Sequence, residues 1–328
     1  MKNIIINIAK YTLVVLMIVS CGEWEYSVPE VSPGLKNDCI NHSLGPNVVG
    51  QYIEFAYAMA IKPEEGKLTT ATVEASIAGA EGTYLDHKSY YTNGSGVNVG
   101  IEVGNASTTS GNKTTVTFTA DTCAATLRYY YKIPEEARGK DVSFTFSASA
   151  SNGEKVQYEM GPYKVREMDL KLDLIAKDGS TCYISIADMA VYDASAATSN
   201  PERIDLIYLH RSVPGVTFNH SIVSPTSEAQ YKPGLELPPG LKNRSKLIKA
   251  WNIQDRQLAR MQYGVFVDDV DLKNMNFNGA PDYIINMRPE SGLWVETENG
   301  KYKAYIFINK ADNAKKEITF SVKRLQVN

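Results

Sequence analysis

The chain has 328 residues, a formal net charge of −3 and 22% charged residues. This balance excludes the strongly basic proteins that bind nucleic acid through their charge. The length suggests two domains, each large enough to bury its own core. Tyrosine is abundant, with 20 residues, and this residue favours β-structure.

The chain begins with a leader in which Lys2 and Lys10 precede an apolar run over residues 11–20. The run is about ten residues long, as in a secretory signal, whereas a membrane-spanning helix needs about twenty. Ser20 directly before Cys21 resembles a bacterial lipobox, in which a small residue precedes a cysteine that is lipidated. The sequence therefore predicts a signal peptide over residues 1–20 and a lipid on Cys21. An ordinary signal peptide beside an incidental cysteine is the alternative.

Residues 21–35 follow the lipobox and show no apolar periodicity, so we expect a tether. A lipid on Cys21 makes the protein membrane-anchored rather than membrane-spanning. Glu23 and Glu25 resemble the acidic signals that send lipoproteins of Bacteroides-like bacteria to the outer surface. The predicted location is therefore the outer membrane, with the protein facing the cell exterior.

Three cysteines remain after the lipobox: Cys39, Cys123 and Cys182. An odd number cannot pair fully, and their spacing lacks the close pairs of a zinc site. We expect small, buried, inert thiols. A disulfide between Cys39 and Cys123 is the main alternative.

Asn-Gly and Asp-Gly pairs mark hairpins along the chain. For residues 142–160, a three-residue loop places all the apolar residues on one face, whereas a two-residue loop does not. The predicted register pairs Phe146 with Tyr158 and Phe144 with Met160.

A second hairpin is predicted over residues 170–189, with the loop at residues 177–179. Its register pairs Leu174 with Cys182, Leu172 with Ile184 and Leu170 with Ile186. Cys182 would then point into the core, which agrees with an inert thiol.

Residues 245–263 differ from their surroundings because their apolar residues recur at roughly helical spacing. We expect a helix or a partly helical crossover packed on the second sheet. Its basic side chains favour a solvated helix face over a patch for anionic ligands.

The last hairpin lies in residues 293–309, with a two-residue loop at Asn299 and Gly300. The predicted pairs are Val295 with Ala304, Leu293 with Ile306, Glu296 with Lys303 and Trp294 with Tyr305. Each cross-strand pair contributes about 0.2–1 kcal/mol.

Short strands with closely spaced turns predict a mainly β protein of two β-sandwiches. The first, over residues 36–166, is expected to be immunoglobulin-like. The second is expected over residues 168–328, with one short helical segment.

The run from residue 129 to residue 158 carries a family resemblance. It resembles the late strands of immunoglobulin-like domains in Bacteroides surface lipoproteins, through Pro134, Gly139, Lys140, Val142, Phe144 and Phe146. Residues 34–38, 263–272 and 293–309 are similar to one group of these lipoproteins, which is labelled as a domain of unknown function. The resemblance implies fold and location, and it implies no activity.

A looser similarity is to the accessory glycan-binding lipoproteins of starch-utilisation-type systems. Those proteins also combine a lipid anchor, a tether and stacked β-sandwiches, and they hold sugars on aromatic platforms. The similarity implies polysaccharide or an outer-membrane transporter complex as partners.

Motifs for catalysis are missing from the sequence, which has no HExxH, no GxSxG and no glycine-rich phosphate loop after a strand. We therefore expect no enzyme activity, no cofactor and no metal. His210 and His220 flank a Pro-Gly turn and could approach each other, as ordinary polar residues. Asp268, Asp269 and Asp271 are expected to be loop carboxylates, with calcium as the alternative.

Aromatic residues on the last hairpin give the best functional lead. Glu296 and Lys303 mark one face as solvated, and Trp294 and Tyr305 share that face. A sugar ring can lie on such aromatic surface. The candidate ligand-binding residues are Trp294, Tyr305, Glu296, Asn309 and Trp251, and a covered, buried face is the alternative.

The function predicted from these features is that of a non-catalytic lipoprotein at the cell surface, which binds glycan for a polysaccharide-uptake system. The alternative is an adhesin-like or envelope structural lipoprotein with a protein partner.

Overall fold

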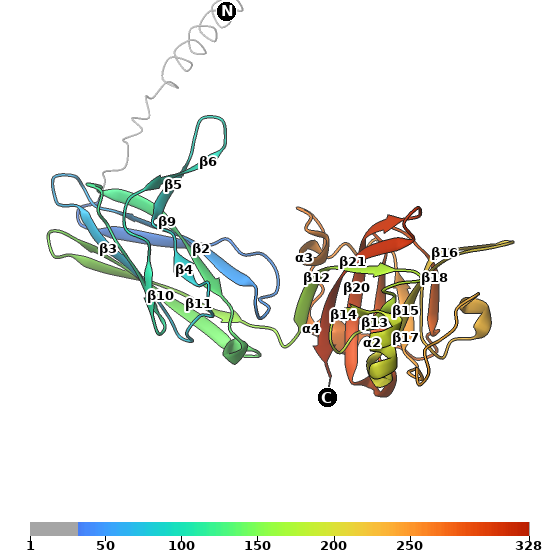
Figure 1. Ribbon diagram of the computed structural model, residues 1–328. Coiled ribbons are helices and arrows are strands. Elements are labelled where there is room, and N and C mark those ends of the chain that lie inside the picture. The colour runs from blue at the N-terminus through green and yellow to red at the C-terminus, as the bar shows by residue number, and fades with distance from the viewer. Residues whose placement is uncertain (1–31, 328) are drawn as a thin grey trace, which may run out of the picture. The chain divides into compact units, whose positions relative to one another are not determined.

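The computed structural model describes residues 32–327, which form 21 strands and three short α-helices (Figure 1). The predicted mainly β class is therefore confirmed. The predicted signal peptide, the lipidation site Cys21 and most of the tether lie outside the described residues. Across residues 32–327, no helix has the length and apolar character that crossing a membrane requires.

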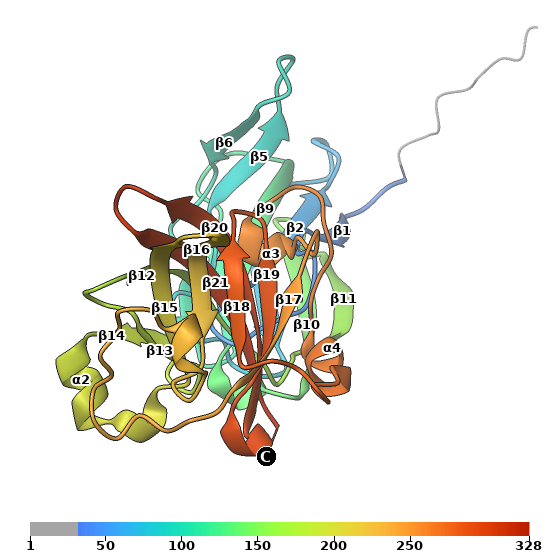
Figure 2. The same cartoon turned by 90° about the vertical axis from the view of Figure 1, so that its right-hand side faces the viewer.

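The N-terminal β-sandwich contains strands β1 to β11 (Figures 1 and 2). Its four-stranded sheet has the order β1 (Lys36–Asn41), β2 (Tyr52–Ala60), β9 (Ala124–Lys132), β4 (Tyr84–Leu85). Its five-stranded sheet has the order β11 (Lys155–Lys164), β10 (Asp141–Ala150), β3 (Leu68–Ala75), β8 (Lys113–Thr117), β7 (Thr108–Ser110). A separate hairpin consists of β5 (Lys88–Thr92) and β6 (Asn98–Glu102), and the turn η1 (Glu135–Ala137) links β9 to β10.

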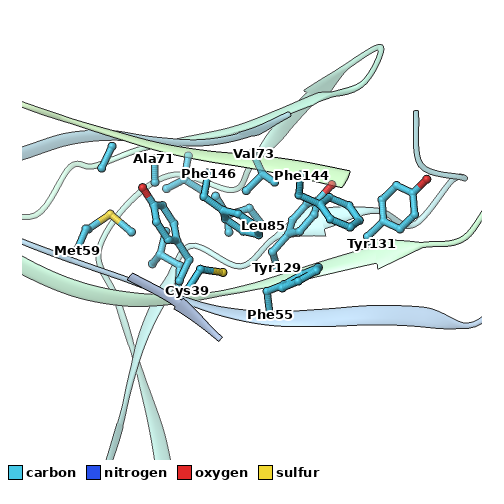
Figure 3. Packing of buried hydrophobic residues seen from close by; sticks show 14 of the residues in the cluster. Cys39, Phe55, Met59, Ala71, Val73, Leu85, Tyr129, Tyr131, Phe144 and Phe146 are labelled. Carbon is cyan, nitrogen blue, oxygen red and sulfur yellow. The ribbon is translucent and has the colours of Figure 1, made fainter. Parts of the chain in front are cut away.

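The core of this sandwich follows from the alternation of β9 and β10, in which every second side chain is buried. Figure 3 shows the aromatic rings that meet between the two sheets. The Phe55 ring centroid lies 4.9 Å from that of Phe144 and 5.2 Å from that of Phe146, both edge to face. Such edge-to-face pairs are favoured by the ring quadrupoles. Because the odd-numbered residues of β9 fill the core, its even-numbered residues face outward.

The hairpin of β10 and β11 has the predicted register, with Phe144 opposite Met160 and Phe146 opposite Tyr158. Gly153 in the loop has a φ of 90°, a left-handed conformation that favours glycine. The prediction of a bulged three-residue loop is therefore confirmed.

The C-terminal region consists of two five-stranded sheets and short helices. One sheet has the order β12 (Asp169–Lys177), β21 (Glu317–Gln326), β20 (Tyr302–Asp312), β19 (Gly292–Glu296), β17 (Lys246–Ala250). The other has the order β14 (Ala190–Tyr192), β13 (Tyr183–Ser185), β15 (Leu206–Val213), β16 (Val216–Val223), β18 (Tyr283–Met287). The helices and turns are α2 (Ala194–Ser199), α3 (Arg256–Ala259), α4 (Asp269–Asn274), η2 (Pro201–Arg203), η3 (Ala229–Tyr231) and η4 (Glu298–Gly300).

The predicted hairpin over residues 170–189 is wrong. β12 pairs with β21, so Leu174 lies opposite Phe320 instead of Cys182. The Asp-Gly turn does form, and Lys177 N–H donates to the Thr181 carbonyl over 2.8 Å. That turn carries the chain from one sheet to the other, where β13 pairs with β14 and β15. A turn signal identifies the reversal of the chain, but it does not identify the pairing partner.

Residues 245–263 are partly helical and do not form a continuous helix, because their first part is the edge strand β17 and only four residues form α3. Leu247 of β17 pairs with Val295 of β19. The expected packing on the sheet is correct for α3, since Leu258 belongs to the same buried cluster as Trp294. Helices α2 and α4 were not predicted.

Cys39, Cys123 and Cys182 are free, so the alternative disulfide between Cys39 and Cys123 is absent. Burial raises the pKa of the Cys39 thiol to about 12 and that of Cys182 to about 11. These two thiols therefore stay protonated and inert, as predicted.

Candidate functional site

The aromatic face predicted on the last hairpin is covered. Its register is as predicted, with Trp294 opposite Tyr305. However, Trp294 is 7% exposed and Tyr305 is fully buried. The Tyr305 hydroxyl donates to the Ile253 carbonyl in the segment that precedes α3. The expectation of an exposed platform here is therefore wrong, because residues 251–280 fold over this face.

The polar residues predicted beside that platform bond to protein groups. The Asn309 side chain donates to the Leu258 carbonyl over 2.8 Å. Glu296 accepts from Lys246 over 2.9 Å, in the neighbouring strand β17. Lys303 donates to two carbonyls at the end of α4, each over 2.9 Å. The bonds of Asn309 and Lys303 hold the covering segment, residues 251–280, in place.

A buried ion pair anchors the same segment. Lys323 of β21 and Asp255 both have fully buried side chains, and Lys323 Nζ lies 2.6 Å from Asp255 Oδ2. Asp255 also accepts from Leu258 N–H over 2.9 Å as the N-cap of α3. Lys323 donates to the Val267 carbonyl over 2.7 Å. These bonds give both buried charges partners within the protein.

Trp251 is the one predicted site residue that stays largely open, with 53% exposure. Lys249 Nζ lies 4.4 Å from its ring centroid, in a cation–π contact. Trp251 therefore differs from the four other predicted site residues, because its side chain is open to solvent.

An open cluster of aromatic rings lies on the N-terminal sandwich. Tyr130 of β9 pairs with Glu54 of β2 on one side and with Tyr84 of β4 on the other. The Tyr84 and Tyr130 ring centroids are 4.8 Å apart and nearly parallel, and Tyr52 meets Tyr130 edge-on at 6.3 Å. Tyr52 and Tyr84 are 40% and 42% exposed. We call Tyr52, Tyr84 and Tyr130 the tyrosine platform.

Charged groups border the tyrosine platform along β9. Arg128 Nη1 lies 3.0 Å from His42 Nδ1, and the Arg128 guanidinium lies 5.6 Å from the centroid of the Tyr90 ring. The Tyr90 hydroxyl donates to Asp86 over 2.6 Å. That bond is the main reason why the pKa of Tyr90 rises to about 12. Burial, assisted by Arg128, lowers the pKa of His42, so the imidazole is neutral near pH 7.

Burial also raises the pKa values of Tyr84 and Tyr130. Their hydroxyls therefore stay protonated at neutral pH and can donate hydrogen bonds as well as accept them. Tyr84 and Tyr130 thus offer apolar ring surface together with neutral polar hydroxyls.

A groove of about 430 Å³ continues the same sheet face toward the start of β9. Its floor is made of small side chains, its first wall comes from β1 and its second wall comes from β5. These groups are Ala58, Ala60, Ala124 and Thr126 for the floor, Lys36, Asn37 and Asp38 for the first wall, and Ser89, Tyr90 and Tyr91 for the second. We call it the alanine groove.

The three tyrosines at 129–131 open the stretch that resembles the late strands of immunoglobulin-like domains, but that resemblance did not separate their faces. Tyr129 and Tyr131 are buried, while Tyr130 between them faces outward. The pairing with Tyr84 comes from a two-residue strand that carries no strong sequence signal. The alternation was visible, whereas the neighbours that complete the platform were not.

The two histidines expected to approach each other do so. His210 and His220 pair across β15 and β16, with ring centroids 4.5 Å apart. His220 is buried, and its two ring nitrogens lie 2.7 Å from the Tyr208 hydroxyl and 2.7 Å from Asn313 Oδ1. Burial lowers the pKa of His220, which keeps it neutral within this chain of bonds.

Two of the three aspartates near residue 270 cap the N-terminus of helix α4. Asp268 accepts from Asp271 N–H over 3.2 Å, and the Asp271 side chain accepts from Asp268 N–H over 2.9 Å, which forms a capping box for α4. Arg166 pairs with Asp268 at 3.1 Å and with Asp269 at 3.2 Å. Within residues 32–327, no group of three or more His, Cys, Asp or Glu residues is arranged to hold a metal ion.

Two family models match the chain. Residues 32–165 match "Domain of unknown function (DUF4466)", and residues 166–327 match "Domain of unknown function (DUF8576)". The crystal structure of a DUF4466 family protein from Parabacteroides merdae is 46% identical in sequence, with a TM-score of 0.84. The alignment covers 90% of this chain and 99% of that one.

More distant matches are to pilins. The major pilin subunit of Bacillus cereus is 12% identical, with a TM-score of 0.27 over 47% of this chain and 46% of that one. A fragment of a major pilin of Streptococcus agalactiae is 11% identical, with a TM-score of 0.30 over 88% of this chain and 91% of that one. No curated protein matches significantly.

Proposed function

This chain belongs to the DUF4466 family, a family of unknown function, and on that premise we propose that it is a non-catalytic surface lipoprotein that binds glycan. The observation that carries the proposal is the tyrosine platform on the open face of the first sheet. The ligand is expected there, and not on the covered face of Trp294 and Tyr305.

The platform has the chemistry that sugar recognition needs. A sugar ring presents an apolar C–H surface that packs on aromatic rings, while its rim of hydroxyls takes hydrogen bonds. Tyr52, Tyr84 and Tyr130 supply the rings, and their hydroxyls supply donors and acceptors. Glu54 and Arg128 lie at positions on the same face and can bond to the rim.

The surface location rests on the sequence. The predicted lipid on Cys21 would hold the protein at the outer membrane, and the tether would carry the sandwich away from the lipid. A glycan held there would be close to an outer-membrane transporter, which is the partner expected for an uptake system.

Retardation in native gels that contain neutral polysaccharides tests the proposal. Starch, xyloglucan, mixed-linkage β-glucan and mannan provide the first panel. We expect at least one of them to slow the wild-type protein, and Tyr130→Ala to abolish the effect because the central ring of the platform is lost. Tyr263→Ala is the matched control, since this tyrosine lies in the C-terminal region and is 78% exposed. Equal retardation of wild type and Tyr130→Ala would contradict the proposed site.

A protein partner is the second candidate function. Hairpin β5–β6 extends away from the sheet (Figure 2) and exposes Tyr91, Val97 and Ile101 at 51%, 55% and 55%. An isolated two-stranded hairpin is marginally stable in water, so a partner that covered these side chains would stabilise it. This candidate predicts that cross-linking through residue 97 captures a defined partner and that no glycan retards the protein.

A further inference from the structure

We infer that the tyrosine platform and the alanine groove form one continuous track along β9, which binds several consecutive units of a linear, neutral glycan chain. This inference rests on the proposed function and specifies its ligand class. The competing arrangement is a site for a single sugar, confined to the tyrosine platform.

The two parts of the track lie on the same strand. The outward residues of β9 run from Ala124 and Thr126 in the alanine groove, through Arg128, to Tyr130 in the platform. Strands rise about 3.4 Å per residue, so Ala124 and Tyr130 are roughly 20 Å apart. A sugar ring is similar in size to a tyrosine ring, and one unit therefore cannot contact both ends.

The groove has a shape that suits a chain. Ala58, Ala60 and Ala124 end at Cβ, so the floor between the walls is low. The wall at β5 is fixed to β9, because Ser89 Oγ accepts from Thr126 N–H over 3.0 Å. Tyr90 in that wall is held by Asp86 and by the guanidinium of Arg128. The same Arg128 therefore supports the wall and lies between the two parts of the track.

The charges along the track favour a neutral ligand. Three cationic and three anionic side chains stand on or beside it: Lys36, Arg128 and Lys132, with Asp38, Glu54 and Asp86. Because the opposite charges balance, a uronic acid polymer or a sulfated glycan gains no net attraction. The presence of both donors and acceptors suits the hydroxyls of a neutral sugar chain.

Calorimetry with oligosaccharide ladders tests the inference on the full chain. Malto-, cello-, xylo- and manno-oligosaccharides from two to six units are the probes, and polygalacturonic acid is the anionic comparator. We expect affinity to rise about tenfold from the shortest to the longest member of the preferred ladder, since each added unit gains contacts.

Two variants at opposite ends of the track sharpen the test. Ala58→Gln places a side chain across the groove floor, and Ala58→Ser is its matched control. Ala58→Gln should remove most of the gain with length and leave the shortest ligand unaffected, whereas Tyr130→Ala should weaken every member of the ladder. Thermal unfolding of each variant checks that the sandwich remains folded.

The outcomes separate this inference from the proposed function. Binding that neither increases with length nor responds to Ala58→Gln would overturn the track and leave a single-sugar site on the platform. Tighter binding of polygalacturonic acid than of every neutral ladder would overturn the neutral ligand class. Failure of all polysaccharides to bind would overturn the proposed function, and this inference with it.

Discussion

Two aromatic sheet faces of this protein differ in solvent exposure. In the N-terminal sandwich, Tyr130 and Tyr84 form a cross-strand pair on an open face. In the C-terminal region, Trp294 and Tyr305 form a cross-strand pair of the same kind, which is buried. The difference shows that an aromatic pair on a strand stays exposed or becomes part of a core according to what the rest of the chain places over it.

The covering segment explains the difference. Residues 251–282 connect β17 to β18, include α3 and α4, and pack on the face that carries Trp294. The N-terminal sandwich also has a long connecting segment, the hairpin β5–β6. This hairpin lies beside β9 and extends away from the sheet (Figures 1 and 2). Residues 251–282 cover a sheet face, whereas the hairpin β5–β6 forms one wall of the alanine groove.

The largest effect is expected from breaking the anchor of the covering segment. Asp255→Ala leaves the buried charge of Lys323 without a partner and removes the N-cap of α3. We expect the free energy of unfolding to fall by about 3–5 kcal/mol in urea denaturation. The double variant Asp255→Leu with Lys323→Met should lose less, because no uncompensated charge remains. A loss in Asp255→Ala no larger than in the double variant would contradict the anchoring role.

Trp294→Ala and Tyr130→Ala compare the two faces directly. Trp294→Ala opens a cavity under the covering segment and should cost about 3–5 kcal/mol of stability, without changing glycan retardation. Tyr130→Ala removes a half-exposed ring and should cost about 1 kcal/mol or less, while it abolishes retardation. Chemical denaturation and native gels on the same preparations measure both properties. The comparison fails if Trp294→Ala impairs binding at a temperature where the variant is fully folded.

A smaller effect should follow from one hydroxyl of the covered pair. Tyr305→Phe removes the donor to the Ile253 carbonyl and leaves the ring in place. We expect a loss of about 1 kcal/mol and faster amide exchange in residues 251–260, measured by hydrogen–deuterium exchange. Tyr84→Phe on the open face is the control, and no change in exchange near β17 is expected from it.

The smallest effect concerns pH. The pKa of His220 is lowered in the folded protein by burial, so the unfolded chain binds this proton first as the pH falls below about 6.5. Stability should therefore decrease from pH 7 to pH 5, and His220→Gln should reduce that slope. His42 on the open face also has a lowered pKa, but it is less buried, and His42→Gln should change the slope less. Urea denaturation at several pH values measures both slopes; a steeper acid slope in His220→Gln than in wild type would refute the assignment.

The sequence by itself determined the mainly β class and the local registers around the Asn-Gly turns. In the hairpins of residues 142–160 and 293–309, one register alone aligns the apolar side chains, and both predictions were correct. Periodicity of two is a local property, because successive side chains point to opposite sides of any strand. The alternation of side chains along a strand therefore does not depend on the rest of the chain.

Tertiary structure alone decided which strands became neighbours and which faces were covered. β12 leaves its predicted partner for β21, about 150 residues further along the chain. Trp294 becomes core because residues 251–280 fold over it, and Tyr130 stays open because β5–β6 does not. These outcomes depend on the free energy of burying apolar surface between distant segments. A short stretch of sequence does not indicate which distant segment will pack on it.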